Sequence, residues 1–169
     1  MAITSRSTSH RVSSTRGFAL LVAVIFMSTV LTLGLALGSL GYKQQLIASS
    51  ATASQIAFYV ADAGLECGLY ADQQENTFNF DSNVNAPAPS MKCDGVFGIA
   101  TSTISHTADQ WATTGRFSLD NNTHCVDVTV YKFAAGGTYI FSQGYDVACS
   151  VVATPKGARF TARGVFAHY

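Results

Sequence analysis

The most constraining feature of the sequence is an uninterrupted apolar run over residues 18–42. It consists mainly of Leu, Val, Ala, Phe, Ile, Met and Gly, and its only ionisable group is the phenol of Tyr42. At roughly 1.5 Å per residue, a helix of this length crosses about 30 Å of hydrocarbon. A helix buried in a globular core is the alternative, but such helices rarely stay apolar on every face for so long. We therefore interpret the run as a helix that spans a bilayer or originates in one.

The charges on either side of this run give it a direction. Residues 1–17 contain Arg6, Arg11 and Arg16 and no acidic residue. Of the 10 basic and 10 acidic residues in the chain, this leaves 7 basic and 10 acidic residues for the remainder. A positive flank is retained on the cytoplasmic side of a membrane. We therefore expect the C-terminal part of the chain to be exported.

All four cysteines fall in this exported part. An even number of cysteines in an exported domain suggests two disulfides, although three pairings are open. We favour a bond from Cys67 to Cys93, which would tie a helix end to a loop. The second bond would then join Cys125 to Cys149 and close a hairpin.

Two processing sites fit the sequence. An ordinary secretory signal would be cut among the small residues at 34–39, but the apolar run is longer than the usual signal core. The other site is the junction Arg16-Gly17-Phe18, where a basic residue and a glycine directly precede the apolar run. It resembles the processing site of type IV prepilins, which a prepilin peptidase cuts after the glycine. The resemblance implies that Gly17 precedes the cut and that Phe18 becomes a methylated mature N-terminus.

A second motif strengthens this resemblance. Residues 55–66 read Gln-Ile-Ala-Phe-Tyr-Val-Ala-Asp-Ala-Gly-Leu-Glu. They look like the segment of many minor pilins and pseudopilins in which the helix leaves the membrane and an Ala-rich, acidic stretch ends in Gly-Leu-Glu. Together the two motifs cover the chain up to about residue 70, and the remainder resembles the family only in being short, cysteine-containing and β-rich.

One position departs from the pattern of major pilins. Major pilins usually carry glutamate at the fifth mature position, where it neutralises the N-terminal amine of a neighbouring subunit. Counted from Phe18, this position is Val22. A carboxylate inside a bilayer is costly and is kept mainly for a function. The departure resembles certain minor subunits and argues against a role as the repeating subunit of a filament.

The expected fold is α+β and pilin-like: a long N-terminal helix packed on a small antiparallel sheet. After a cytoplasmic leader (1–17), the helix has a transmembrane and assembly half (18–42) and an amphipathic half whose apolar residues recur at helical spacing (43–70). An Asn- and Pro-rich loop follows over residues 71–95. Residues 96–169 form the sheet.

Two pairs of residues in the helix are candidates for contact with other helices. Gly34 and Gly38 are small residues four apart, which lets two membrane helices approach closely; chance in a Gly-rich segment is the alternative. Asp62 and Glu66 share one helix face. They suggest a cationic group on a neighbouring subunit, with a solvated face as the simpler interpretation.

The strand pattern begins after the loop. Val126, Val128 and Val130 alternate within residues 125–133, which predicts a half-buried strand. Turns at residues 134–137 and 154–157, a return strand at 138–142, a last strand at 159–168 and a weaker strand at 96–104 complete the prediction. We expect a four-stranded antiparallel meander that packs on the helix, since a sheet of this size needs such a partner.

The sequence offers little support for catalysis. No nucleophile–base pair, phosphate loop or metal-ligand spacing stands out, so we expect no enzyme activity, no cofactor and no metal. His124 adjoins Cys125, but neighbouring side chains of a strand point to opposite faces. A small basic patch of Lys156, Arg159 and Arg163 could contact DNA; an ordinary solvated strand face is the simpler interpretation.

These observations predict a structural subunit, of the minor kind, in a type IV pilus or a related type II secretion-like filament. Its partners would be other pilin subunits, the prepilin peptidase and the pilus assembly platform. The chain would be a single-pass protein of the cytoplasmic membrane before assembly and part of an extracellular filament or of the cell envelope afterwards. The alternative is a lone membrane-anchored extracellular binding domain outside any filament.

Overall fold

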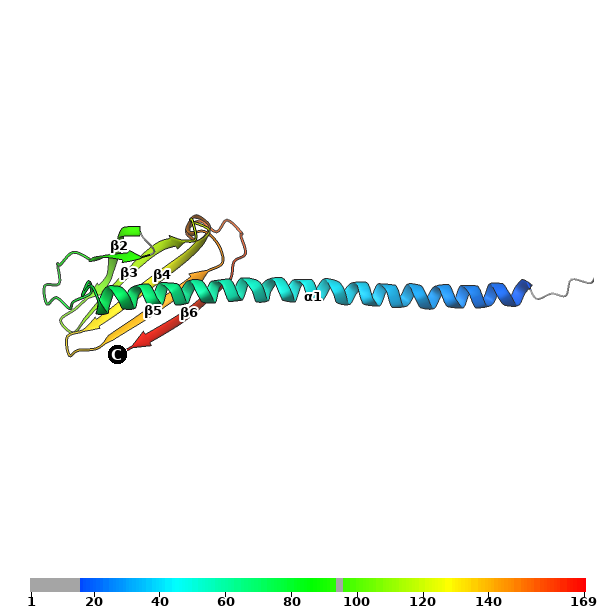
Figure 1. Cartoon of the computed structure of the whole chain (residues 1–169), viewed down its shortest axis with the longest axis horizontal. Coiled ribbons are helices and arrows are strands. Elements are labelled where there is room, and N and C mark those ends of the chain that lie inside the picture. The colour runs from blue at the N-terminus through cyan, green and yellow to red at the C-terminus, as the bar shows by residue number, and fades with distance from the viewer. Residues whose placement is uncertain (1–15, 94–95) are drawn as a thin grey trace, which may run out of the picture. The chain divides into compact units, whose positions relative to one another are not determined.

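The chain is α+β in the computed structural model, which describes residues 16–93 and 96–169 (Figure 1). The helices are α1 (Arg16–Gln73) and α2 (Cys149–Ala153). The strands are β1 (Ser90–Cys93), β2 (Val96–His106), β3 (Gln110–Leu119), β4 (His124–Phe133), β5 (Thr138–Tyr145) and β6 (Ala162–His168). They form one six-stranded antiparallel sheet in the order β1-β2-β3-β4-β5-β6.

The chain divides into two compact units, residues 1–46 and 47–169. The first unit contributes the N-terminal part of α1. The second, which we call the head unit, contains the rest of α1, the sheet and α2. No proline interrupts α1, and good helix formers such as Leu and Ala dominate its sequence.

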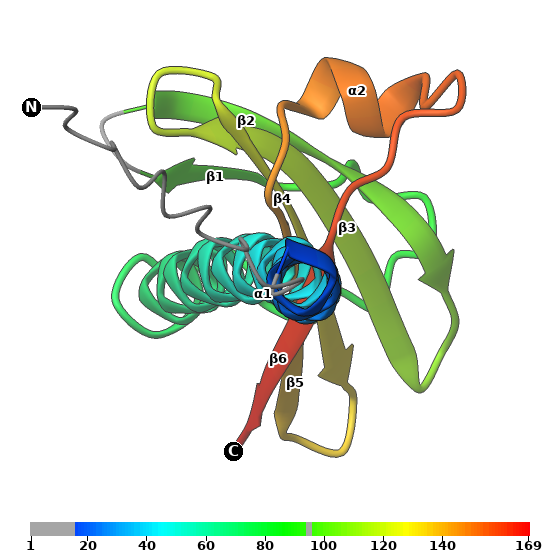
Figure 2. The same cartoon turned by 90° about the vertical axis from the view of Figure 1, so that its right-hand side faces the viewer.

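Within the head unit, α1 packs across one face of the sheet, and α2 lies on the other side (Figure 2). Burial of α1 begins at Ala53 and continues to Asp72. The helix contributes Val60 and Ala71 to a core that also contains the inward side chains of the strands. The fully buried strand residues there include Met91, Val126, Val128, Val130 and Ile140.

Two glycines allow the helix to lie directly on the sheet. A Cβ atom at Gly144 of β5 would collide with the backbone of Ala57 and Ala61 in α1. A Cβ atom at Gly64 of α1 would collide with the side chains of Val126 and Ser142. The Gly of the Gly-Leu-Glu motif is therefore required here by the close contact between helix and sheet.

The two disulfides join Cys67 to Cys93 and Cys125 to Cys149, which is the pairing favoured from the sequence. The first ties α1 to β1, and the second ties α2 to β4. No free cysteine is present among residues 16–93 and 96–169. Both bonds fix short elements that bury few residues of their own.

The predicted four-stranded sheet is wrong, because the sheet has six strands. The prediction missed β3, whose inward side includes Thr113 and Gly115 and so hides the alternation of apolar residues. A Cβ atom at Gly115 would lie 3.0 Å from the end of the Met91 side chain, which packs against this glycine.

The boundaries of the predicted loop at residues 71–95 also change. The helix continues to Gln73, since Ala71 is buried in the core and Asp72 binds the sheet. At the other end of the loop, Met91 and Cys93 face the core from β1. A strand of only four residues after two prolines gave no recognisable period.

The helix–sheet contact predicts the effect of adding one methyl group. Gly144→Ala should lower the free energy of unfolding by about 2 kcal/mol or more, because backbone atoms of α1 must move away. Gly41→Ala is the matched control, since no atom lies within 4 Å of a Cβ at this exposed helical glycine. Chemical unfolding of the full chain in detergent measures both. Equal stability of the two variants would contradict the close contact.

Candidate functional site

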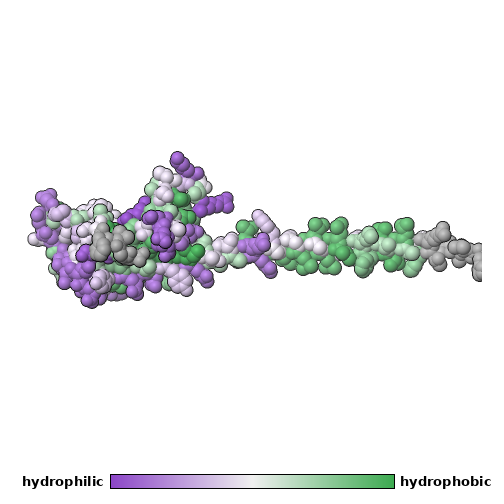
Figure 3. All heavy atoms as spheres, turned by 45° about the horizontal axis from the view of Figure 1, so that its top comes forward, coloured by the Kyte–Doolittle hydropathy of each residue, from purple (hydrophilic) through white to green (hydrophobic). Residues whose placement is uncertain are grey.

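The largest candidate interaction surface is the N-terminal part of α1. Every residue from 17 to 52 is exposed, including Phe18 and Met27, each with 73% of its surface accessible. This part of the helix is long and apolar enough to cross a membrane. Figure 3 shows hydrophobic residues along it, in contrast to the largely hydrophilic surface of the head unit. The exposed apolar surface therefore surrounds the helix instead of forming a stripe.

The Ser and Thr side chains of the apolar run bond within the helix. Within the apolar run over residues 18–42, the side chains of Ser28, Thr29, Thr32 and Ser39 each donate a hydrogen bond to the backbone carbonyl three residues earlier, at 2.8–2.9 Å. An unpaired polar group in hydrocarbon would cost several kcal/mol. These bonds within the helix make the four side chains compatible with an apolar environment.

The residues assigned to processing and helix packing all lie on this surface. Phe18 and Val22 are one helical turn apart and share a face. A Cβ atom at Gly17, Gly34 or Gly38 would meet nothing within 4 Å. Gly34 and Gly38 thus leave a shallow place where another helix backbone can approach. Residues 1–15 of the predicted leader lie outside the described residues.

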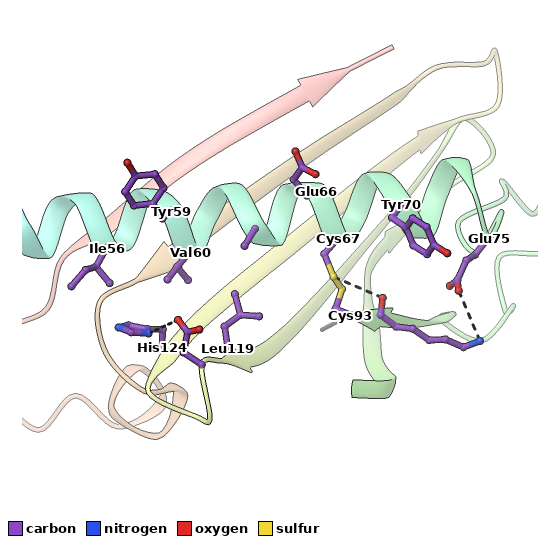
Figure 4. A pocket seen from close by; sticks show the side chains of 13 residues that line it. Ile56, Tyr59, Val60, Glu66, Cys67, Tyr70, Glu75, Cys93, Leu119 and His124 are labelled. Carbon is purple, nitrogen blue, oxygen red and sulfur yellow. Dashed lines mark hydrogen bonds and ion pairs between the residues drawn. A yellow bond between two sulfur atoms is a disulfide. The ribbon is translucent and has the colours of Figure 1, made fainter. Parts of the chain in front are cut away.

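A groove of about 810 Å³ runs along α1 in the head unit (Figure 4). Its apolar wall includes Ile56, Val60 and Leu119, together with the disulfide between Cys67 and Cys93. Polar and charged side chains line its rim in two pairs, Lys92 with Glu75 at 3.9 Å and His124 with Asp120 at 3.1 Å.

Glu66 also lines the groove, and Asp62 is exposed one turn earlier on the helix. Their placement on an exposed helix face agrees with the sequence pattern. No ion pair joins either carboxylate to another described residue.

The end of α1 is fixed to the sheet by a buried polar cluster that the sequence analysis missed. The Asp72 carboxylate accepts hydrogen bonds from Lys132 Nζ at 2.7 Å, Thr138 Oγ1 at 3.2 Å and the Tyr169 hydroxyl at 2.5 Å. Asp72 is 5% exposed. Burial, and then the bond to Asp72, raise the pKa of Tyr169 to about 12. In the sequence, the only signal of this role is that an acid, Asp72, stands at the end of the apolar face of the helix.

A second ion pair lies on the other face of the sheet. Arg116 binds Asp127 through two hydrogen bonds of 2.6 and 2.7 Å, and the Tyr145 hydroxyl donates to the same carboxylate at 3.1 Å. The hydrogen bond to Asp127 raises the pKa of Arg116, and burial raises the pKa of Tyr145. These groups neutralise one another, so they present no basic surface.

The predicted basic patch is not assembled as expected. Arg159 precedes β6, which begins at Ala162, so it does not share a strand face with Arg163. The guanidinium of Arg163 instead donates to Ser54 Oγ of α1 at 2.7 Å. A strand face shared by Arg159 and Arg163 is therefore wrong, because β6 begins only at Ala162.

The histidines occupy separate places. His124 contacts Asp120 and Thr123, while the neighbouring Cys125 is buried in its disulfide. His106 stacks on Trp111 with ring centroids 4.5 Å apart. Among residues 16–93 and 96–169, no three His, Cys, Asp or Glu side chains gather where they could hold a metal ion.

No family model matches the chain, and no curated protein and no solved structure matches it either.

The Asp72 cluster predicts how stability responds to alkaline pH. An unfolded tyrosine ionises near pH 10, whereas folded Tyr169 holds its proton to about pH 12. Its contribution is therefore complete below about pH 10 and is lost as the pH rises through this window. Tyr169→Phe should make the free energy of unfolding fall less steeply between these pH values. Tyr59→Phe, at an exposed helix position, is the control. If the free energy of unfolding falls equally steeply with pH in the wild type and in both variants, the role given to Tyr169 is contradicted.

Proposed function

We propose that this chain is a minor structural subunit of a type IV pilus or a related type II secretion-like filament. The observation that carries the proposal is the helix surface over residues 17–52, which is exposed at every position and apolar over most of its length. Burial of such a surface is worth about 25 cal/mol per Å². Lipid before assembly, and the helices of other subunits after it, would supply that burial.

The proposed order of events is the one that the resemblance to type IV prepilins implies. The prepilin peptidase would cut between Gly17 and Phe18, and the new amine on Phe18 would be methylated. The helix would then leave the membrane at the assembly platform and pack against other pilin helices, with Gly34 and Gly38 allowing close approach. The head unit would be displayed outside the cytoplasmic membrane, where its two disulfides are stable. The role proposed is assembly and display, without catalysis or a cofactor.

Val22 supports low copy number. The amine of a buried mature N-terminus needs an anionic partner in the low-dielectric interior of a filament. Since Val22 offers none, a continuous array of this chain would leave a buried amine at every repeat. A small number of copies, at one end of a filament, avoids this cost.

A lone membrane-anchored extracellular binding domain is the second candidate. Val22 favours it to some extent, because an anchor outside a filament needs no partner for the amine. The two candidates differ in processing, since a lone anchor keeps its N-terminal residues.

Processing can be tested at the junction. Gly17→Arg should leave a larger precursor in the membrane, because a bulky cation replaces the residue without a side chain at the proposed cut. Arg16→Lys, which keeps the charge one residue earlier, should be processed normally. Immunoblots of cell membranes compare the two sizes. A Gly17→Arg protein that matures like the wild type would exclude this cleavage site.

Copy number can be measured in sheared filaments. We expect quantitative proteomics to find this chain at a small fraction of the main filament protein, and to find none from cells that carry Gly17→Arg. If this chain dominates the filament, the minor role is wrong. If it never co-purifies with a filament, the lone anchor is the better assignment.

A further inference from the structure

The groove along α1 lies between two walls that are covalently linked. One wall is the helix, and the other is formed by β1 together with the turn between β3 and β4. The disulfide between Cys67 and Cys93 joins α1 to β1 and lines the groove itself (Figure 4). A surface whose parts are held in place before a ligand arrives loses less entropy on binding. The groove is therefore a preformed site within the head unit.

The chemistry of the groove changes along its length. Ile56, Val60 and Leu119 give one end an apolar lining. Toward the end of α1 the lining includes Glu66 and Tyr70, which are one helical turn apart and share a helix face. Tyr70 is 56% exposed. An occupant that fits both ends is therefore apolar at one end and polar at the other.

The charges of the groove are not fully paired. Its lining contains three acids, Glu66, Glu75 and Asp120, together with Lys92 and His124. Glu75 lies 3.9 Å from Lys92, and Asp120 lies 3.1 Å from His124. Glu66 is exposed, and no ion pair joins it to another described residue. One carboxylate of the groove is thus left for a cation from outside the chain.

The charge of the whole head unit selects the same kind of partner. Residues 47–169 contain 6 basic and 10 acidic residues. The field of such a surface attracts cationic partners. It disfavours anionic lipid headgroups and nucleic acid, which binds proteins through its negatively charged phosphates. The occupant is therefore best sought among cationic protein segments.

A second copy of this chain has few cations to offer. Four of the six Lys and Arg side chains of the head unit are already bonded: Lys92 to Glu75, Arg116 to Asp127, Lys132 to Asp72 and Arg163 to Ser54. The other two, Lys156 and Arg159, belong to the connection between α2 and β6, outside any helix or strand. This points to a different protein as the source of the cation.

We propose that the groove binds a short amphipathic segment of a different subunit, whose cationic side chain pairs with Glu66. Its apolar side chains fill the end lined by Ile56, Val60 and Leu119. Arginine suits the position best, because its guanidinium binds a carboxylate through two hydrogen bonds and also stacks on an aromatic ring such as Tyr70. This inference rests on the proposed function, since it names the surface through which the head unit contacts another subunit.

Photo-cross-linking of the full chain in its native cells tests the occupant. The photoreactive residue p-benzoylphenylalanine replaces Tyr70, which lies one turn from Glu66. Irradiation should join the chain to a different protein, and mass spectrometry should find an arginine or lysine within about four residues of the joined position, since one helical turn spans that length. No product, a product of two copies, or a joined peptide without a cation overturns the proposal.

The matched control carries the same photoreactive residue at Phe166. This side chain is 59% exposed and does not line the groove. Irradiation of this variant should not give the product formed from position 70. The same product from both positions would show a chance encounter, and it would overturn the proposal.

A charge reversal separates groove binding from contacts driven by the apolar helix. Glu66→Lys should reduce the product from position 70 by about ten-fold, because it sets like charges together. Asp109→Lys makes the same change at an exposed position outside the groove and should leave the product unchanged. Replacing the partner's cation by glutamate should restore cross-linking to Glu66→Lys. Undiminished product with Glu66→Lys overturns the proposal.

Sheared filaments distinguish this inference from the proposed function. If the wild-type chain is absent from them, the proposed function fails, and the inference fails with it. If the wild-type chain is present, the cross-linked partner should be another protein of the same filament, and Glu66→Lys should lower the amount of this chain in it. An unchanged amount of Glu66→Lys, or a partner outside the filament, overturns the inference alone.

Discussion

An apolar helix surface of this length cannot remain in water, and the rest of the structure is arranged around that constraint. Residues 17–52 expose large hydrophobic side chains on every side. The backbone bonds are closed within the helix, and the four Ser and Thr side chains of the apolar run bond to it as well. What remains for a partner to satisfy is side-chain contact alone, which either lipid or other helices can supply.

The same helix serves a second purpose in the head unit, where its later residues form one side of the core. The sheet presents Val126, Val128 and Ile140 to it, and two glycines, Gly64 and Gly144, bring the backbones together. Asp72 then fixes the helix end to β4 and β5. Disulfides stabilise the two short elements, β1 and α2, mainly by restricting the unfolded chain. The head unit thus depends on the helix for its core.

The sequence predicted the features that follow from strong periodicity and missed those that depend on tertiary contact. The apolar run, the α+β class and the valine alternation of β4 could be read directly. The strand β3 could not, because Thr113 and Gly115 occupy inward positions that apolar residues usually fill. Likewise, Asp72 is ordinary in the sequence and becomes important only because Lys132 and Tyr169 converge on it. The groove beside Glu66 is visible only when α1, β1 and the turn between β3 and β4 are placed side by side.

The central claim, that the helix surface is built for assembly after processing, is tested most directly by the mass of the native N-terminus. Intact mass and N-terminal peptide spectra of protein from its own envelope should show a chain that begins at Phe18 and carries one methyl group on its amine. A chain that begins near Ser39, or one that retains residues 1–17, would contradict the account.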